Sequence, residues 1–174
     1  TCPIDVYGGT KLSGEILTKV YSKQYGVEYT IIRPSAVYGP TDINRRVSQI
    51  FVENALNKIP LVLHNGGASK LDFSYIEDTS DGFVLAVESK KAVNETFNIT
   101  RGEGRSLKEF AEILKKSISE LAIDERPAPK DEIRPERGAL DIAKARKLLN
   151  YNPKYPLEDG IPKYVEFIKN FQKK

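Results

Sequence analysis

Apolar residues recur at helical spacing in the first segment of the chain and then give way to a short run of β-branched residues. Over residues 7–25 the apolar stripe consists of Leu12, Ile16, Leu17, Val20 and Tyr21. This spacing is that of an amphipathic helix, and Gly26 supplies a stop at its end. The run VEYTIIR at 27–33 is typical of a strand, which Pro34 ends. A helix, a glycine and a strand in this order predict the second half of a βαβ unit, and therefore a parallel sheet.

The remaining chain alternates between helical and strand patterns, which predicts an α/β fold throughout. Helical periodicity appears over 45–59, 77–89, 106–118, 141–151 and 157–171. Strand patterns appear over 60–67, 70–76 and 95–100. We expect Asp78 to cap the helix at 77–89, and we expect Ser106 and Glu109 to form a capping box. The charged, proline-rich stretch 124–138 is expected to be mostly loop.

Composition and charge exclude several classes of protein. The chain has 174 residues and a formal net charge of +3, and its cations are scattered rather than gathered into a nucleic-acid footprint. Its apolar runs are too short to span a membrane, and no signal-peptide pattern opens it. Cys2 is the single cysteine, which excludes an internal disulfide framework and fits a reducing, cytoplasmic compartment. His64 is the single histidine, and no acidic cluster shows ligand spacing, so we expect no metal site.

The opening stretch TCPIDVYGGTKLSGE holds the first candidate for chemistry. Tyr7 and Lys11 are four residues apart, so a helix places their side chains on one face. A tyrosine hydroxyl beside a lysine ammonium is a plausible pair for proton transfer. Taken alone, a Tyr-x-x-x-Lys spacing is weak evidence, because roughly one such match is expected by accident in a chain of this composition.

Five motifs that follow one another along the chain strengthen the interpretation of Tyr7 and Lys11 as a functional pair. The first follows P-x-x-x-Y-x-x-[ST]-K-x-x-x-E and consists of Pro3, Tyr7, Thr10, Lys11 and Glu15. The second follows R-P-x-x-V-Y-G-P and consists of Arg33, Pro34, Val37, Tyr38, Gly39 and Pro40. The third follows D-[FY]-x-Y-[VI]-x-D and consists of Asp72, Phe73, Tyr75, Ile76 and Asp78. The fourth consists of Asn98, Ile99, Gly102, Ser106 and Glu109, and the fifth of Asp141, Lys144, Ala145, Tyr151, Pro153 and Gly160.

With these motifs the chain resembles the C-terminal half of an extended short-chain dehydrogenase/reductase, in the branch of nucleotide-sugar epimerases, dehydratases and decarboxylases. The resemblance implies the C-terminal part of a Rossmann-like, doubly wound parallel sheet with a smaller α/β substrate-binding lobe. Residues 1–40 would end the dinucleotide-binding domain, with about 72–100 returning to it, and 41–71 with 101–174 would form the lobe. The family's glycine-rich phosphate turn does not occur in this sequence, so we expect about 140 further residues before Thr1 and no turnover by this chain alone.

The resemblance also implies roles for the opening pair and for the second motif. Tyr7 would be the acid/base for a sugar oxygen while a hydride passes to or from NAD, with NADP as the alternative cofactor. A tyrosine side chain ordinarily has a pKa near 10, and a neighbouring cation favours its phenolate. Lys11 would therefore tune the base and bond the nicotinamide ribose, and Pro34, Ser35 and Val37 would lie against the nicotinamide and the sugar.

Two departures from the family pattern bear on the substrate. Ser35 stands where relatives often have asparagine, and Leu71 stands where many carry an arginine that meets the nucleotide diphosphate. A diphosphate needs some cation, and the candidates are Arg45, Arg46, Arg134 and Arg137, with Arg137 favoured and Arg134 next.

The leading prediction is an NAD-dependent epimerase or dehydratase of a UDP-, dTDP- or GDP-linked sugar. One alternative is a carbonyl reductase that acts on a non-nucleotide substrate, which Leu71 and Ser35 favour. A second alternative is a non-catalytic nucleotide-binding relative, against which the intact Tyr7 and Lys11 argue. Relatives often dimerise through two long helices, one of which carries the tyrosine motif. A homodimer through the stripe at 7–25 is therefore expected, although the same stripe also fits an internal core.

Overall fold

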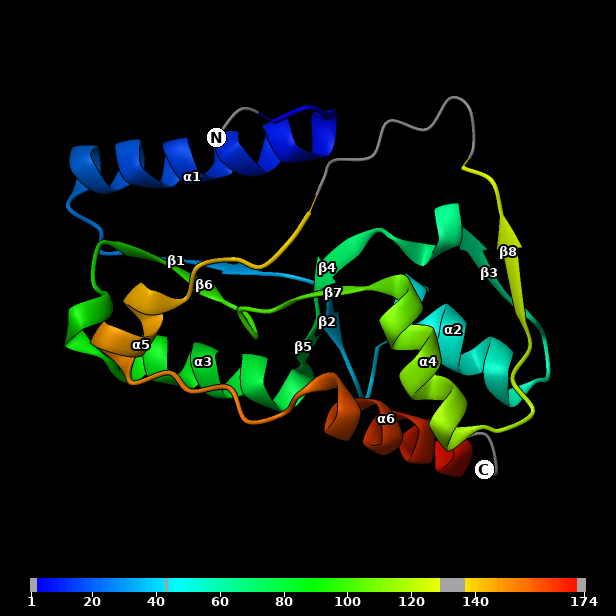
Figure 1. Ribbon diagram of the computed structural model, residues 1–174. Helices are drawn as coiled ribbons and strands as arrows, with labels where there is room; N and C mark the ends of the chain where they lie inside the picture. The colour runs from blue at the N-terminus through cyan, green and yellow to red at the C-terminus, as the bar shows by residue number, and fades with distance from the viewer. Residues whose placement is uncertain (1–2, 43, 129–136, 172–174) are drawn as a thin grey trace.

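A computed structural model describes residues 3–42, 44–128 and 137–171 of the chain (Figure 1). Its α-helices are α1 (Val6–Tyr25), α2 (Val47–Leu56), α3 (Ile76–Glu88), α4 (Leu107–Ser117), α5 (Ala143–Leu149) and α6 (Leu157–Phe171). Its strands are β1 (Thr30–Pro34), β2 (Val37–Tyr38), β3 (Leu61–His64), β4 (Lys70–Asp72), β5 (Ser74–Tyr75), β6 (Glu95–Ile99), β7 (Gly104–Ser106) and β8 (Ile123–Arg126). Two 3-10 turns, Asn65–Gly67 and Lys90–Ala92, complete the described elements. Helices and strands alternate along the chain, which confirms the α/β class.

The first helix and strand form the expected half of a βαβ unit. Gly26 ends α1 in the left-handed conformation, with φ 69°, which glycine adopts without steric cost. Strand β1 then pairs in parallel with β6, with Thr30 opposite Glu95 and Pro34 opposite Ile99. Helix α1 lies along one face of this pair, and α3 and α5 lie on the other face (Figure 1).

Three further strand pairs lead from this sheet into the second part of the fold. Strands β2 and β5 pair in parallel, as do β3 and β8, whereas β4 and β7 pair antiparallel. Helices α2, α4 and α6 contact one another beside these strands (Figure 1). Parallel pairing requires a crossover between the partners, and this is the reason that each parallel pair joins segments far apart in the sequence.

Apolar side chains are buried in two clusters. The smaller cluster lies among β6, α3 and α5 and consists of Ala86, Ala92, Phe97, Ile99, Ile142, Ala145, Leu149 and Tyr151. The larger cluster lies among α2, α4, α6 and the short strands, and its aromatic members are Tyr38, Phe51, Phe73, Tyr75, Phe110 and Tyr164. Ring contacts at 5.0–6.3 Å between centroids link these aromatic residues in edge or tilted geometry, which is the preferred arrangement of aromatic pairs.

One local prediction was wrong, and the structure refines two others. Asp78 does not cap α3, because its carboxylate accepts from the backbone N of Lys154 and of Tyr155. Tyr75 is the N-cap residue, and it makes no side-chain capping bond. The strand expected over 70–76 is two short strands with different partners, β4 and β5. Residues at the start of 124–138 belong to strand β8, because β3 supplies a partner that a local pattern does not reveal.

Other predictions concern the capping box, the surface and the domains. The capping box of Ser106 and Glu109 is present in both directions and is confirmed. No helix in the described part is long and apolar enough to cross a membrane. The division into 1–40 with 72–100, and 41–71 with 101–174, stays a prediction. Helix α1 has no buried residue, so its apolar stripe is not core within this chain.

Candidate functional site

Helix α1 places Tyr7 and Lys11 on one exposed face near its start. Asp5 caps the helix by accepting a hydrogen bond from the Gly8 backbone N at 2.6 Å. The Lys11 Nζ lies 5.3 Å from the centroid of the Tyr7 ring, within the range of a cation–π contact. Tyr7 is 67% exposed, so its phenol is open to a partner. The structure therefore brings together the two residues that the sequence proposed as a pair.

The segment after β1 begins beneath the N-terminal part of α1 (Figure 1). Pro34 is the exposed last residue of β1, Val37 begins β2, and Ser35 lies half-buried between them. Ala36 has a φ of 37°, a turn conformation that a residue with a Cβ rarely adopts. Ligands of open α/β sheets bind beyond the carboxyl ends of the strands, so Pro34, Ser35 and Val37 occupy the expected edge.

Glu15 and Arg33 join α1 to β1. The Arg33 Nε and Nη2 donate to the two carboxylate oxygens of Glu15 at 2.6 and 2.5 Å, which is a bidentate, charge-assisted pair. The hydrogen bonds that Arg33 donates to Glu15 hold the pKa of the Glu15 carboxyl below its ordinary value and raise the pKa of Arg33. The motifs contain both residues, but no spacing in the sequence indicates that they pair.

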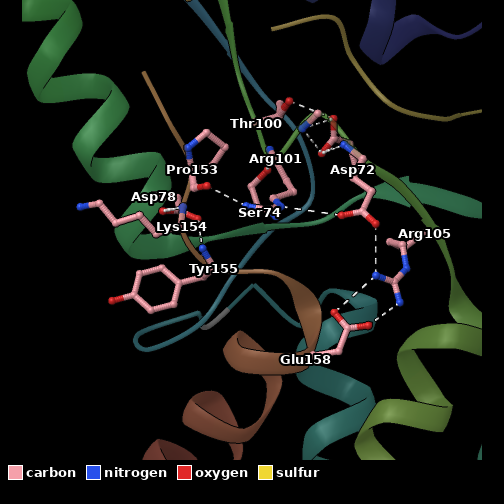
Figure 2. Close-up of polar contacts among 12 residues, drawn as sticks. Asp72, Ser74, Asp78, Thr100, Arg101, Arg105, Pro153, Lys154, Tyr155 and Glu158 are labelled. Atoms are coloured by element: carbon pink, nitrogen blue, oxygen red, sulfur yellow. Dashed lines mark hydrogen bonds and ion pairs between the residues drawn. The ribbon is translucent and has the colours of Figure 1, made fainter. Parts of the chain in front are cut away.

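A buried carboxylate on β4 connects three segments of the chain. Asp72 is fully buried and accepts from the Thr100 hydroxyl at 2.9 Å and from the Leu140 backbone N at 2.9 Å. It also accepts from the backbone N of Gly102 at 3.1 Å and of Glu103 at 3.4 Å. Figure 2 shows this network at the junction of β4, β6 and the segment before α5.

A second carboxylate and two arginines extend the junction (Figure 2). Asp78, in the first turn of α3, accepts from the backbone N of Lys154 at 2.7 Å and of Tyr155 at 2.9 Å. Arg101 donates from its backbone to Ser74 and from its side chain to the Pro153 carbonyl.

Arg105 on β7 binds Glu158 on α6 at 2.7 Å and Glu109 on α4 at 2.9 Å. The hydrogen bond that Arg105 donates to the Glu158 carboxylate is the main reason that the pKa of Arg105 is raised. With these contacts, the junction fixes how the C-terminal segments lie against the sheet.

The candidate phosphate-binding arginines are only partly placed. Arg45 is exposed, and its backbone N donates to the Gln49 side chain at 2.7 Å. Arg46 is the exposed N-cap residue of α2. Arg137 is exposed in the segment before α5, and Arg134, like Cys2, lies outside the described residues. The role of these arginines in binding a phosphate stays a prediction.

The donors present fit the nicotinamide end of a dinucleotide. The Lys11 ammonium and the Tyr7 hydroxyl are on one exposed helix face, and Ser35 directly follows the last residue of β1. These groups are suited to ribose hydroxyls and to a sugar oxygen. Among residues 3–42, 44–128 and 137–171, no group of His, Cys, Asp and Glu side chains could hold a metal ion.

Comparison with known proteins identifies the family. Residues 1–100 match the sequence profile of the NAD dependent epimerase/dehydratase family. The chain is 33% identical to a putative UDP-glucose 4-epimerase of Methanocaldococcus jannaschii, covering 97% of this chain and 54% of that protein. It is 32% identical to UDP-glucuronic acid decarboxylase 1 of Arabidopsis thaliana, covering 94% of this chain and 38% of that protein.

A solved structure agrees with these sequence matches. The UDP-glucuronic acid 4-epimerase from Bacillus cereus, crystallised with UDP-glucuronic acid and NAD, superposes with a TM-score of 0.89. It is 33% identical, and the match covers 98% of this chain and 54% of that one. The chain thus spans about half the length of several proteins that it matches. From the motifs, the fold and the matched residues together, this chain belongs to the NAD dependent epimerase/dehydratase family.

Proposed function

We propose that this chain forms the catalytic-tyrosine half of an NAD-dependent enzyme that epimerises a nucleotide sugar. The observation that carries the proposal is the exposed pair on α1, with the Lys11 Nζ at 5.3 Å from the Tyr7 ring, above the segment that follows β1. The similarity to epimerases that bind UDP-glucose or UDP-glucuronic acid supports this substrate class. The proposed full-length protein is this chain preceded by the dinucleotide-binding half that the family pattern implies.

Tyr7 would act as the acid/base. Its phenolate oxygen takes the proton from a sugar hydroxyl as the carbon that bears this hydroxyl becomes a ketone, and the phenol returns the proton when the alcohol re-forms. The ammonium of Lys11 stabilises the phenolate by its positive charge. NAD, whose nicotinamide ribose Lys11 would bond, would supply both the acceptor and the donor for the hydride of that carbon.

The segment after β1 and the candidate arginines would hold the rest of the substrate. Ser35 offers a hydroxyl for a sugar or phosphate oxygen, and Pro34 and Val37 offer apolar contact to flat rings. We propose that Arg137 is the main cation that binds the diphosphate, and that Arg45 and Arg134 contribute further contacts. A bidentate guanidinium contact gives both charge and orientation, which a lysine in the same place does not.

A second candidate function is a carbonyl reductase on a substrate without a nucleotide. The observation that favours it is Leu71, a half-buried apolar residue on β4, at the position where relatives carry a diphosphate-binding arginine. An epimerase regenerates its cofactor within each turnover, whereas a reductase exchanges it. Retention of NAD by the purified full-length protein, and a rise in its melting temperature with UDP-glucose, distinguish the epimerase from the reductase.

The decisive experiment removes the Tyr7 hydroxyl. In the full-length protein, Tyr7→Phe is expected to lower kcat with UDP-glucose or UDP-glucuronic acid at least about hundredfold, because the proton has no acceptor. Binding of the nucleotide sugar should change less than about threefold, since a single exposed hydroxyl is lost. The matched control is Tyr25→Phe at the other end of α1, which should retain full activity.

The outcome that overturns the proposal is full turnover by Tyr7→Phe. The 174-residue chain alone, assayed beside it, should show no turnover, because it contains no glycine-rich phosphate turn. We further propose that the full-length protein is a homodimer formed through α1. A cytoplasmic location, inferred from the single cysteine, stays a prediction.

A further inference from the structure

Within the described residues, one ion pair is the side-chain polar link between helix α1 and the rest of the molecule. None of the 20 residues of α1 is fully buried, and Leu12, Thr18 and Ser22 are half-buried, so its packing against the described chain is shallow. Among the described residues, the side-chain hydrogen bonds that leave α1 for another element are those of Glu15 with Arg33. The other side-chain hydrogen bonds of α1 go to its own backbone, as from Thr10, Ser13 and Thr18.

The pair has the geometry of a specific connection rather than of a chance surface contact. Both oxygens of Glu15 are engaged, by the Nε and Nη2 of one guanidinium, so the carboxylate and the guanidinium are fixed in distance and in orientation. The Glu15 side chain is 18% exposed and that of Arg33 is 42% exposed, so the pair is partly shielded from solvent and from salt.

The sequence positions of the two residues relate the pair to the site. Glu15 lies one helical turn after Lys11 on the same face of α1, and Arg33 immediately precedes Pro34 and Ser35. The contact therefore connects the helix that carries the acid/base to the strand end that opens the ligand-facing segment.

We propose that Glu15 and Arg33 are positioning residues, which set the separation between the Tyr7–Lys11 pair and the segment from Pro34 to Val37. The proposal rests on the proposed function for its catalytic consequence, but its structural part stands separately. Tyr7 and Lys11 lie on the same helix, so their mutual distance does not depend on Arg33. Loss of the pair should thus displace both groups together relative to the bound substrate.

The first test measures the connection without any activity. In the 174-residue chain, Glu15→Gln should accelerate amide hydrogen exchange in α1 by about fivefold, the scale of a partly shielded ion pair. The matched control is Glu28→Gln, because Glu28 is an exposed carboxylate just after α1 and its side chain forms no hydrogen bond or ion pair within the described residues. Arg33→Lys, which loses the bidentate geometry, should give an intermediate acceleration.

The second test measures catalysis in the full-length protein. Glu15→Gln should lower kcat about ten- to hundredfold, the cost of a displacement near 1 Å, with KM for UDP-glucose changed less than about threefold. The pH at which kcat is half-maximal should not move, because Lys11 still accompanies Tyr7. The exchanged pair Glu15→Arg with Arg33→Glu should restore at least about half of the lost activity.

The outcomes separate this inference from the proposed function. Equal exchange in Glu15→Gln and Glu28→Gln, or an unchanged kcat in Glu15→Gln, would overturn the positioning role. A shift of the half-maximal pH in Glu15→Gln would overturn it as well, since the pair would then act on the acid/base itself. A wild-type full-length protein without turnover would instead overturn the proposed function, and the exchange result would still decide whether the pair holds α1.

Discussion

The carboxylate of Asp72 shows how one buried residue can organise distant parts of the chain. It is fully buried, and four groups donate to it: the Thr100 hydroxyl and the backbone N atoms of Gly102, Glu103 and Leu140. A buried carboxylate is costly unless such donors surround it, and the donors in turn need an acceptor. The family motif indicated Asp72, but only the structure shows that it joins β4 to the segments around residues 100 and 140.

Asp72→Ala should therefore destabilise the chain strongly. We expect a loss of about 3 kcal/mol in the free energy of unfolding, because buried donors are left without an acceptor. Urea denaturation of the 174-residue chain, followed by circular dichroism, measures this change. The control is Asp81→Ala, whose pair with Lys154 is exposed, so its loss should change the free energy of unfolding far less than the loss of Asp72. An equal loss in both variants would contradict the role given to Asp72.

At the scale of elements, a single arginine connects a strand to two helices. Arg105 on β7 binds Glu109 at the start of α4 and Glu158 at the start of α6. The hydrogen bond from the Ser106 backbone amide is the main reason that the pKa of Glu109 is below its ordinary value. The hydrogen bond from Arg105 is the main reason that the pKa of Glu158 is lowered. Carboxylates in the first turn of a helix also complement its dipole.

These lowered pKa values predict a loss of stability in acid. A carboxyl group with a lowered folded-state pKa contributes stability above its ordinary pKa of 4.5, and this contribution disappears as pH falls through the folded-state value. The free energy of unfolding should thus decrease below about pH 5. Arg105→Gln should reduce that decrease, by at most about 1 kcal/mol because the partners are partly exposed.

The measurement is a series of urea denaturation curves from about pH 6 to pH 3. Arg126→Gln is the control, because Arg126 pairs with Asp124 in an exposed ion pair and contacts neither glutamate. If the free energy of unfolding falls by the same amount in acid for Arg105→Gln and for the wild type, Arg105 does not set the pKa of Glu158.

At the scale of the whole molecule, α1 presents an exposed apolar surface within the part of the chain that the structure describes. Ile16, Leu17, Val20 and Tyr21 are each more than half exposed. Next to them is an open hollow of about 310 Å³, lined in part by Leu17, Tyr21 and Val27. A contiguous apolar patch on a folded protein marks a surface that another element or another chain covers. The chain also spans about half of several proteins that it matches, which is consistent with a covered surface.

Leu17→Glu in the full-length protein tests whether this surface is a dimer interface. A charge in an apolar interface is costly, so self-association measured by analytical ultracentrifugation should weaken at least about tenfold. The thermal stability of the resulting monomer should change little, since Leu17 is 67% exposed in the single chain. Lys23→Glu, a polar position on the same helix, should leave association nearly unchanged. A stable dimer of Leu17→Glu would show that the interface lies elsewhere, and unfolding of the monomer would assign the stripe to an internal core.

The sequence predicts most elements because their causes are local. The helices at 7–25, 106–118 and 157–171 follow from apolar periodicity and end signals within a few residues, as does the capping box of Ser106 and Glu109. The Tyr7–Lys11 pair was equally predictable from the sequence, because a spacing of four residues in a helix places two side chains together whatever surrounds them. Asp78 shows the limit of this reasoning: the local pattern suggested a cap, but Lys154 and Tyr155 compete for the carboxylate.

The amino-acid sequence by itself determined the order of the helices, the α/β class and the catalytic candidates on the first helix, since these depend on neighbours in the chain. Only the tertiary structure decided which strands pair, that Asp72 and Asp78 bind returning segments, and that Glu15 meets Arg33. Their partners lie between 18 and 77 residues away in sequence. Hydrogen bonds at such separations form only once the packing of both apolar clusters has brought the segments together, and no local pattern records that outcome.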